Sequence, residues 1–84
     1  MTMTVQVVAT WTGPRVTDST WHASRDAFIQ PLIDAGKHDN VPTDNGNGVI
    51  TRKFADNDSA QQWCDWLANN TPSLNTVTTV ITPV

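Results

Sequence analysis

The sequence predicts one small α+β domain, in which a single antiparallel sheet is covered on one face by two helices. Segments with strand-like alternation lie near both ends and in the middle of the chain. The first and the middle segment are each followed by a stretch with helical periodicity. The chain has 84 residues, which is the length of one domain, and a chain this short buries a modest fraction of its surface.

The first strand is predicted over residues 3–11, where apolar and polar side chains alternate. One face is apolar and comprises Met3, Val5, Val7, Ala9 and Trp11. The other face is rich in threonine and comprises Thr4, Gln6, Val8 and Thr10. This alternation is typical of a sheet that is covered on one side only.

The first helix is predicted over residues 19–35, because Asp18 and its neighbours can cap its start. Its apolar stripe comprises Trp21, Phe28, Leu32 and Ala35. Pro31 removes a backbone hydrogen bond, so we expect either a kink before it or a new helical turn that starts there. Gly36 suits the left-handed residue that follows a helix.

The segment 37–48 is too polar to belong to the core. Asn45-Gly46 and Asn47-Gly48 favour hairpin turns, and the sequence leaves open whether residues 40–43 form an edge strand or a plain loop. An EF-hand alignment of residues 43–54 places Thr43 and Phe54 where calcium needs acidic ligands, so no calcium site is expected.

The central strand is predicted over residues 49–55, with Ile50, Arg52 and Phe54 on its buried face. A helix follows, and Asp58 with Gln61 is predicted to form its capping box. Its buried stripe comprises Ala60, Trp63, Cys64 and Leu67, and its end is predicted at Asn69 and Asn70.

The last strand is predicted over residues 74–82, with Val77, Thr79 and Ile81 on one face. The whole order is then β-α-(β)-β-α-β, in which the two halves repeat one pattern. This order predicts a ferredoxin-like split β-α-β sandwich (βαββαβ), with both helices on one face and the threonine-rich face open.

Composition excludes several classes of function. The net charge is −3 and the five basic residues are scattered, so nucleic-acid binding is not expected. No apolar run is long enough to span a bilayer, and the N-terminus does not resemble a signal peptide, so a soluble, cytoplasmic protein without membrane partners is expected. Cys64 is expected in the core.

No group of residues has the spacing of a catalytic or metal site. His22 with Asp26 and His38 with Asp39 are interpreted as ordinary surface contacts. We therefore expect no catalytic residues, no metal and no cofactor.

Arg52 is the main candidate for ligand binding, because a guanidinium between two buried side chains needs a carboxylate partner or access to water. A ligand-binding pocket between helices and sheet is hypothesised, lined by Arg52, Trp21, Phe54 and Trp63. A second hypothesis is an interface on the open sheet face, formed by Thr4, Gln6, Val8, Thr10 and the flanking Trp66.

The stretch Arg52-Lys53-Phe54-Ala55-Asp56, running into Ser59-Ala60-Gln61-Gln62-Trp63, resembles small dimeric α+β-barrel proteins. Cofactor-independent monooxygenases of the antibiotic-biosynthesis type belong to that group. The resemblance covers about a quarter of the chain, and none of the family's functional residues maps onto this sequence. It implies a homodimer joined through open sheet faces.

Three functions are carried forward. The leading expectation is a non-catalytic, self-associating or interaction protein that forms a homodimer. The alternatives are a protein that binds a small molecule of unknown identity, in the manner of a monooxygenase-like dimeric barrel, and a subunit of a larger assembly such as a virion.

Overall fold

A computed structural model describes residues 2–84 and has six regular elements. In chain order they are β1 (Val5–Thr12), α1 (Ser19–Asp34), β2 (Thr43–Asp44), β3 (Val49–Phe54), α2 (Asn57–Asn70) and β4 (Thr76–Pro83). The α+β class is confirmed, since one open antiparallel sheet of four strands is combined with two helices.

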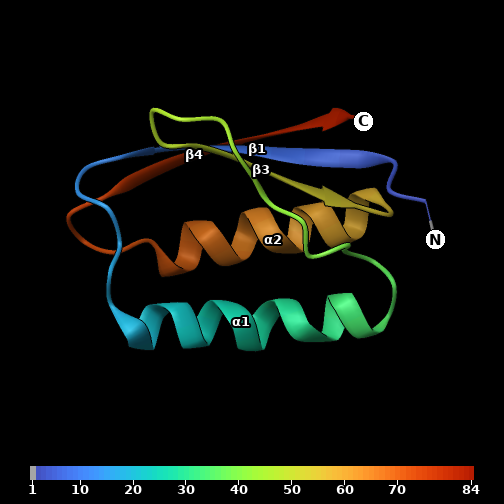
Figure 1. The fold of residues 1–84 in the computed structure, drawn as a ribbon, viewed down its shortest axis with the longest axis horizontal. Coiled ribbons are helices and arrows are strands. Elements are labelled where there is room, and N and C mark those ends of the chain that lie inside the picture. The colour runs from blue at the N-terminus through green and yellow to red at the C-terminus, as the bar shows by residue number, and fades with distance from the viewer. Residues whose placement is uncertain (1) are drawn as a thin grey trace.

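The strands lie in the order β2-β3-β1-β4, and every neighbouring pair is antiparallel. Val7, near the middle of β1, pairs with Arg52 of β3 on one side and with Ile81 of β4 on the other. Both helices lie on the same side of the sheet (Figure 1). Helix α2 contacts β1, β3 and β4, whereas α1 lies farther from the sheet, beyond α2 in the view of Figure 1.

The strand faces follow the alternation of the sequence. Val7 and Ala9 of β1 are buried, as is Phe54 of β3, while Thr4 and Thr10 on the other face of the first strand segment are exposed. The core is completed by the predicted stripe of α2 and by two residues of α1: Ala60, Trp63, Cys64, Leu67, Ile29 and Leu32. The predicted inward face of β3 and the predicted stripe of α2 are therefore confirmed.

The start of α2 differs from the prediction. Asp56 is the capping residue: its backbone is extended and its carboxylate Oδ1 accepts a hydrogen bond of 2.8 Å from the backbone N–H of Ser59. The predicted capping box of Asp58 and Gln61 is wrong by two residues. Asp58 instead lies in the first turn, where its charge suits the helix dipole.

Helix α1 begins as predicted, because the side chain of Asp18 accepts a hydrogen bond from the backbone N–H of Thr20. The helix is continuous through Pro31, so the prediction that a new helical turn starts at that proline is wrong. Gly36 has a φ of 71°, which confirms its predicted left-handed conformation after the helix.

In the polar segment 37–48 the structure corrects the prediction for His38 and answers the question that the sequence left open about an edge strand. His38 is only 3% exposed and belongs to the interior, because its ring stacks on Phe54 at 4.8 Å between centroids. The edge strand β2 is Thr43–Asp44, and so shares one residue with the range considered, 40–43. Gly48 has a φ of 79°, and a Cβ there would lie 2.5 Å from the backbone oxygen of Trp11, so this turn requires glycine.

Strand β4 begins at Thr76 instead of Leu74, because a turn closed by a hydrogen bond from Asn75 N–H to the Pro72 carbonyl precedes it. Leu74 is 77% exposed. Within residues 2–84, neither helix has the length and apolar character needed to cross a membrane.

Candidate functional site

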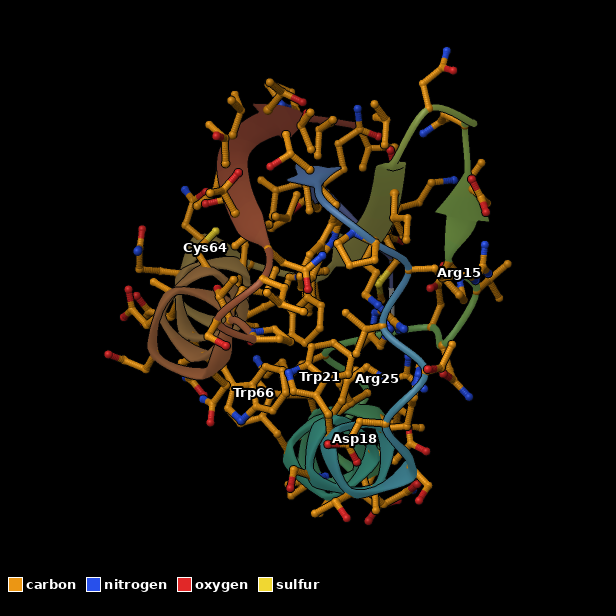
Figure 2. The ribbon with its side chains drawn as sticks, turned by 90° about the vertical axis from the view of Figure 1, so that its left-hand side faces the viewer. Arg15, Asp18, Trp21, Arg25, Cys64 and Trp66 are labelled. Carbon is orange, nitrogen blue, oxygen red and sulfur yellow. The ribbon has the colours of Figure 1, made fainter. Side chains whose placement is uncertain are left out.

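A cavity of about 420 Å³ lies between α1 and the sheet, beside α2. Strands β1 and β3 bound the cavity on the side of the sheet. Its edge is formed by the segment between β1 and α1, together with the turn before β3. The side chains that define its interior are Ala9, Trp11, Trp21, His22, Arg25, Ile50, Arg52 and Trp63. In Figure 2, Trp21 and Arg25 project from α1 toward the sheet, and Arg15 lies on the segment that precedes the helix.

Large aromatic side chains between the two helices hold α1 in this position. Trp66 of α2 contacts Trp21 and Phe28 of α1, with ring centroids 5.4 and 5.6 Å apart. The indole N–H of Trp21 also donates a hydrogen bond of 2.7 Å to the carbonyl of Asn70, at the end of α2. Helix α1 therefore packs on α2 and is separated from β3, and the cavity lies in the space between α1 and the strands β1 and β3.

Arg52 is the most unusual group in the cavity, because it is 7% exposed and forms no ion pair with any residue in the range 2–84. Its Nη1 lies 3.1 Å from Nε2 of His38, and its guanidinium carbon lies 5.2 Å from the ring centre of Trp63. Burial, with the nearby charge of Arg25 as a second cause, lowers the pKa of Arg52 to about 10. The side chain is still protonated at neutral pH.

His38 is a neutral ring that holds one edge of the Arg52 guanidinium by a hydrogen bond. Its Nδ1 lies 2.6 Å from the carbonyl oxygen of Lys53, which can only accept, so Nδ1 carries the hydrogen. Nε2 is then the unprotonated nitrogen that accepts from Arg52. Burial lowers the pKa of His38, and the charge of Arg52 adds to this, while the hydrogen bond to Lys53 and the Asp39 carboxylate partly oppose it.

The cavity concentrates positive charge in an acidic protein. Three of the five basic residues line it, Arg15, Arg25 and Arg52, against one acidic residue, Asp44. Arg25 is already engaged, since its Nη2 lies 3.0 Å from the carboxylate of Asp26. Arg15 is exposed, so Arg52 is the buried cation of this cavity that has no ion pair among the described residues.

Three of the four residues predicted for a pocket meet here: Arg52, Trp21 and Trp63 all line the cavity. Phe54 does not line the cavity, because its ring is fully buried and stacks on His38. Sequence reasoning missed Arg25 and His38. Arg25 lies four residues after Trp21 and so on the same side of α1, which is a signal that could have found it.

The residues predicted for an interface lie on the other side of the sheet. Thr4, Gln6, Val8 and Thr10 alternate with the buried residues of β1 and are half-buried or exposed. Trp66 is not near them, because it packs between the helices of its own chain.

The two histidine pairs differ from expectation. His22 does not contact Asp26: its Nε2 lies 2.8 Å from the carbonyl oxygen of Val16, and Asp26 pairs with Arg25. His38 Nδ1 does lie 3.8 Å from Asp39, but as a buried ring. Cys64 is 8% exposed, in the core as predicted, and within the described chain no three His, Cys, Asp or Glu residues gather as metal ligands would.

Comparison with protein-family models and with curated proteins finds no match to this chain. The residues of the cavity and of the open sheet face are therefore the basis for a functional proposal.

Proposed function

We propose that this chain is a non-catalytic protein that binds a small molecule in the cavity between α1 and the sheet. The observation that supports it is a cavity of about 420 Å³ that is lined by tryptophan side chains and by a buried arginine. Ligand sites in proteins have volumes of roughly 300–1,000 Å³ and combine apolar walls with a few polar groups. Among residues 2–84, those that line the cavity include no nucleophile–base pair, which favours binding over catalysis.

A fragment screen by ¹H–¹⁵N NMR tests this proposal. We expect fragments to shift the backbone amides of Ala9 and Ile50, which pair across β1 and β3 and line the cavity. Ile50→Trp should weaken binding by at least about tenfold, because the larger side chain fills the space.

Val49→Trp is the matched control, since its side chain points to the opposite face of the sheet and the fragments should bind unchanged. Fragments that bind the parent and Ile50→Trp equally well would place the site elsewhere and contradict the proposal.

The ferredoxin-like split β-α-β sandwich is proposed as the finer fold assignment. Its support is the element order, together with the place of β1 between β3 and β4 in the sheet. In a split β-α-β arrangement, a strand from the other half separates the two strands of each β-α-β unit.

Self-association through the open sheet face is the second candidate, and a dimeric α+β-barrel arrangement would join two copies there. The observation that favours it is an uncovered apolar pair: Val8 lies opposite Val80, which is 53% exposed. Threonines surround this pair on the same face, at Thr10, Thr51 and Thr78.

Light scattering over a concentration series tests this candidate. We expect a dimer in the parent and a monomer in Val8→Lys, because the lysine places a charge at the centre of the paired face. Val41→Lys makes the same change at an apolar residue that is 62% exposed and lies outside the strands, and should leave the dimer intact. A parent that is monomeric at every concentration contradicts the candidate.

A further inference from the structure

The charge of Arg52 determines which class of ligand the cavity suits. This inference rests on the proposed function and concerns the same cavity. No carboxylate oxygen of residues 2–84 lies within 4.0 Å of the Arg52 guanidinium, although the side chain is 7% exposed. A buried cation without an anion is an unfavourable arrangement, which an anionic ligand would relieve.

The N–H groups of Arg52 that have no hydrogen-bond partner keep access to open space. The side chain makes one hydrogen bond in the described chain, from Nη1 to His38, and this leaves the edge formed by Nε and Nη2. In residues 2–84, no completely buried side-chain nitrogen or oxygen lacks a partner. Nε and Nη2 therefore keep some accessible surface, and the cavity is accessible space that Arg52 lines.

The geometry points to a small organic carboxylate as the ligand. Its two oxygens would accept the parallel N–H groups of the Nε–Nη2 edge, which is the fork that arginine presents to carboxylates. Its apolar body would lie against Trp11, Trp21 and Trp63, which line the same cavity. His38 prepares this contact, because its bond to Nη1, together with the Trp63 ring 5.2 Å from the guanidinium carbon, restricts the position of the guanidinium.

A singly charged ligand fits better than a phosphate. Both Nε and Nη2 of Arg25 donate to the carboxylate of Asp26, at 3.1 and 3.0 Å, so the second nearby cation is already compensated. Arg15 and Asp44 also line the cavity and carry opposite charges, so the excess is one positive charge, which one negative charge balances and a dianion would exceed.

Matched acids and amides test this inference. Trans-cinnamate and trans-cinnamamide, and benzoate and benzamide, have nearly the same shape and differ in charge. We expect each acid to bind about 10- to 100-fold more tightly than its amide, because the carboxylate adds a negative charge on the acceptor side of the hydrogen bonds from the guanidinium. In NMR spectra, the acids should also shift the Nε–H signal of Arg52.

Arg52→Met should remove the preference for the acid, and Lys53→Met should keep it. The two changes remove the same charge from neighbouring residues of β3, but Lys53 points to the other face of the sheet. Methionine is a suitable replacement, since an apolar side chain of similar volume commonly substitutes for a buried charged one without loss of the fold. If Arg52→Met does not fold, the Nε–H shift and the acid–amide ratio in the parent decide the question.

The outcomes separate this inference from the proposed function. If fragments bind in the cavity but the amides bind as tightly as the acids, or inorganic phosphate binds more tightly than either acid, the carboxylate assignment is wrong and the binding function stands. A preference for acids that survives in Arg52→Met also overturns the assignment. If neither the probe pairs nor the fragments bind at up to about 10 mM, both are wrong.

Discussion

Replacing Phe54 with alanine should lower the free energy of unfolding by about 3–5 kcal/mol. Phe54 is 0% exposed and is one of the largest completely buried side chains of the chain. Its removal loses the transfer free energy of the ring and leaves a hole that the sheet and α2 can fill only in part. At roughly 0.05–0.15 kcal/mol per residue, the whole domain has only about 4–13 kcal/mol to lose.

Urea unfolding followed by tryptophan fluorescence measures this loss, with Phe28→Ala as the matched control. Phe28 is the other phenylalanine of the chain, and it lies half-buried between the helices, where it stacks on Trp63 and Trp66. The same change there should cost clearly less, because part of the ring already contacts water. Equal losses in the two variants would contradict the placement of Phe54 at the centre of the core.

The faces of the strands and the stripe of α2 were predictable, because local periodicity determines them. Val7 and Ala9 face inward since they alternate with threonines, and Trp63 and Leu67 lie four residues apart on one side of a helix. Each of these predictions needs only a window of a few residues, and tertiary packing agrees with the local pattern.

The boundaries were less predictable, because the sequence offers competing signals. Asp56, Asn57, Asp58 and Ser59 can all cap a helix, and only the structure shows that Asp56 does so. Asp56 also has a partner remote in sequence, since Lys37 Nζ lies 2.8 Å from its carboxylate. No local rule includes that contact.

The cavity depends on packing that no single segment encodes. It exists because Trp21 and Phe28 meet Trp66 between the helices, and the bulk of these rings sets how far α1 lies from β3. His38 was missed for a related reason: its sequence neighbours Lys37 and Asp39 are polar, although its own ring packs on Phe54. Arg52 could be singled out because a charge between two buried residues is visible in the alternation itself.

The second large effect is expected at His38. His38→Ala should lower the free energy of unfolding by about 1–3 kcal/mol at neutral pH, because it leaves the Lys53 carbonyl and the Arg52 guanidinium without this partner. His38→Gln should be milder, since an amide can still donate or accept a hydrogen bond there.

The same histidine should make the parent less stable in mild acid. Burial and the charge of Arg52 lower the pKa of the folded-state ring, so the unfolded chain binds the proton more tightly. The contribution of His38 to stability is then fully present above the ordinary histidine pKa of about 6.5 and falls as the pH drops from there toward the folded-state pKa.

Asp56 affects stability at lower pH. Hydrogen bonds from Lys37 and Ser59 lower its pKa to about 2, so its contribution is present above about pH 4 and is lost as the pH falls toward 2.

Unfolding curves between about pH 8 and about pH 5 test the role of His38. The parent should lose stability across this range, and His38→Gln should lose less, because the titrating ring is gone. His22→Gln is the matched control, because it makes the same substitution at a ring that bonds to the Val16 carbonyl and leaves the contact between His38 and Arg52 in place, so the response of the parent should persist. A parent and a His38→Gln variant with the same pH dependence would show that folding does not lower the pKa of His38. The ring would then be protonated in mild acid, where its Nε2 could not accept from Arg52 and the guanidinium would lose this support.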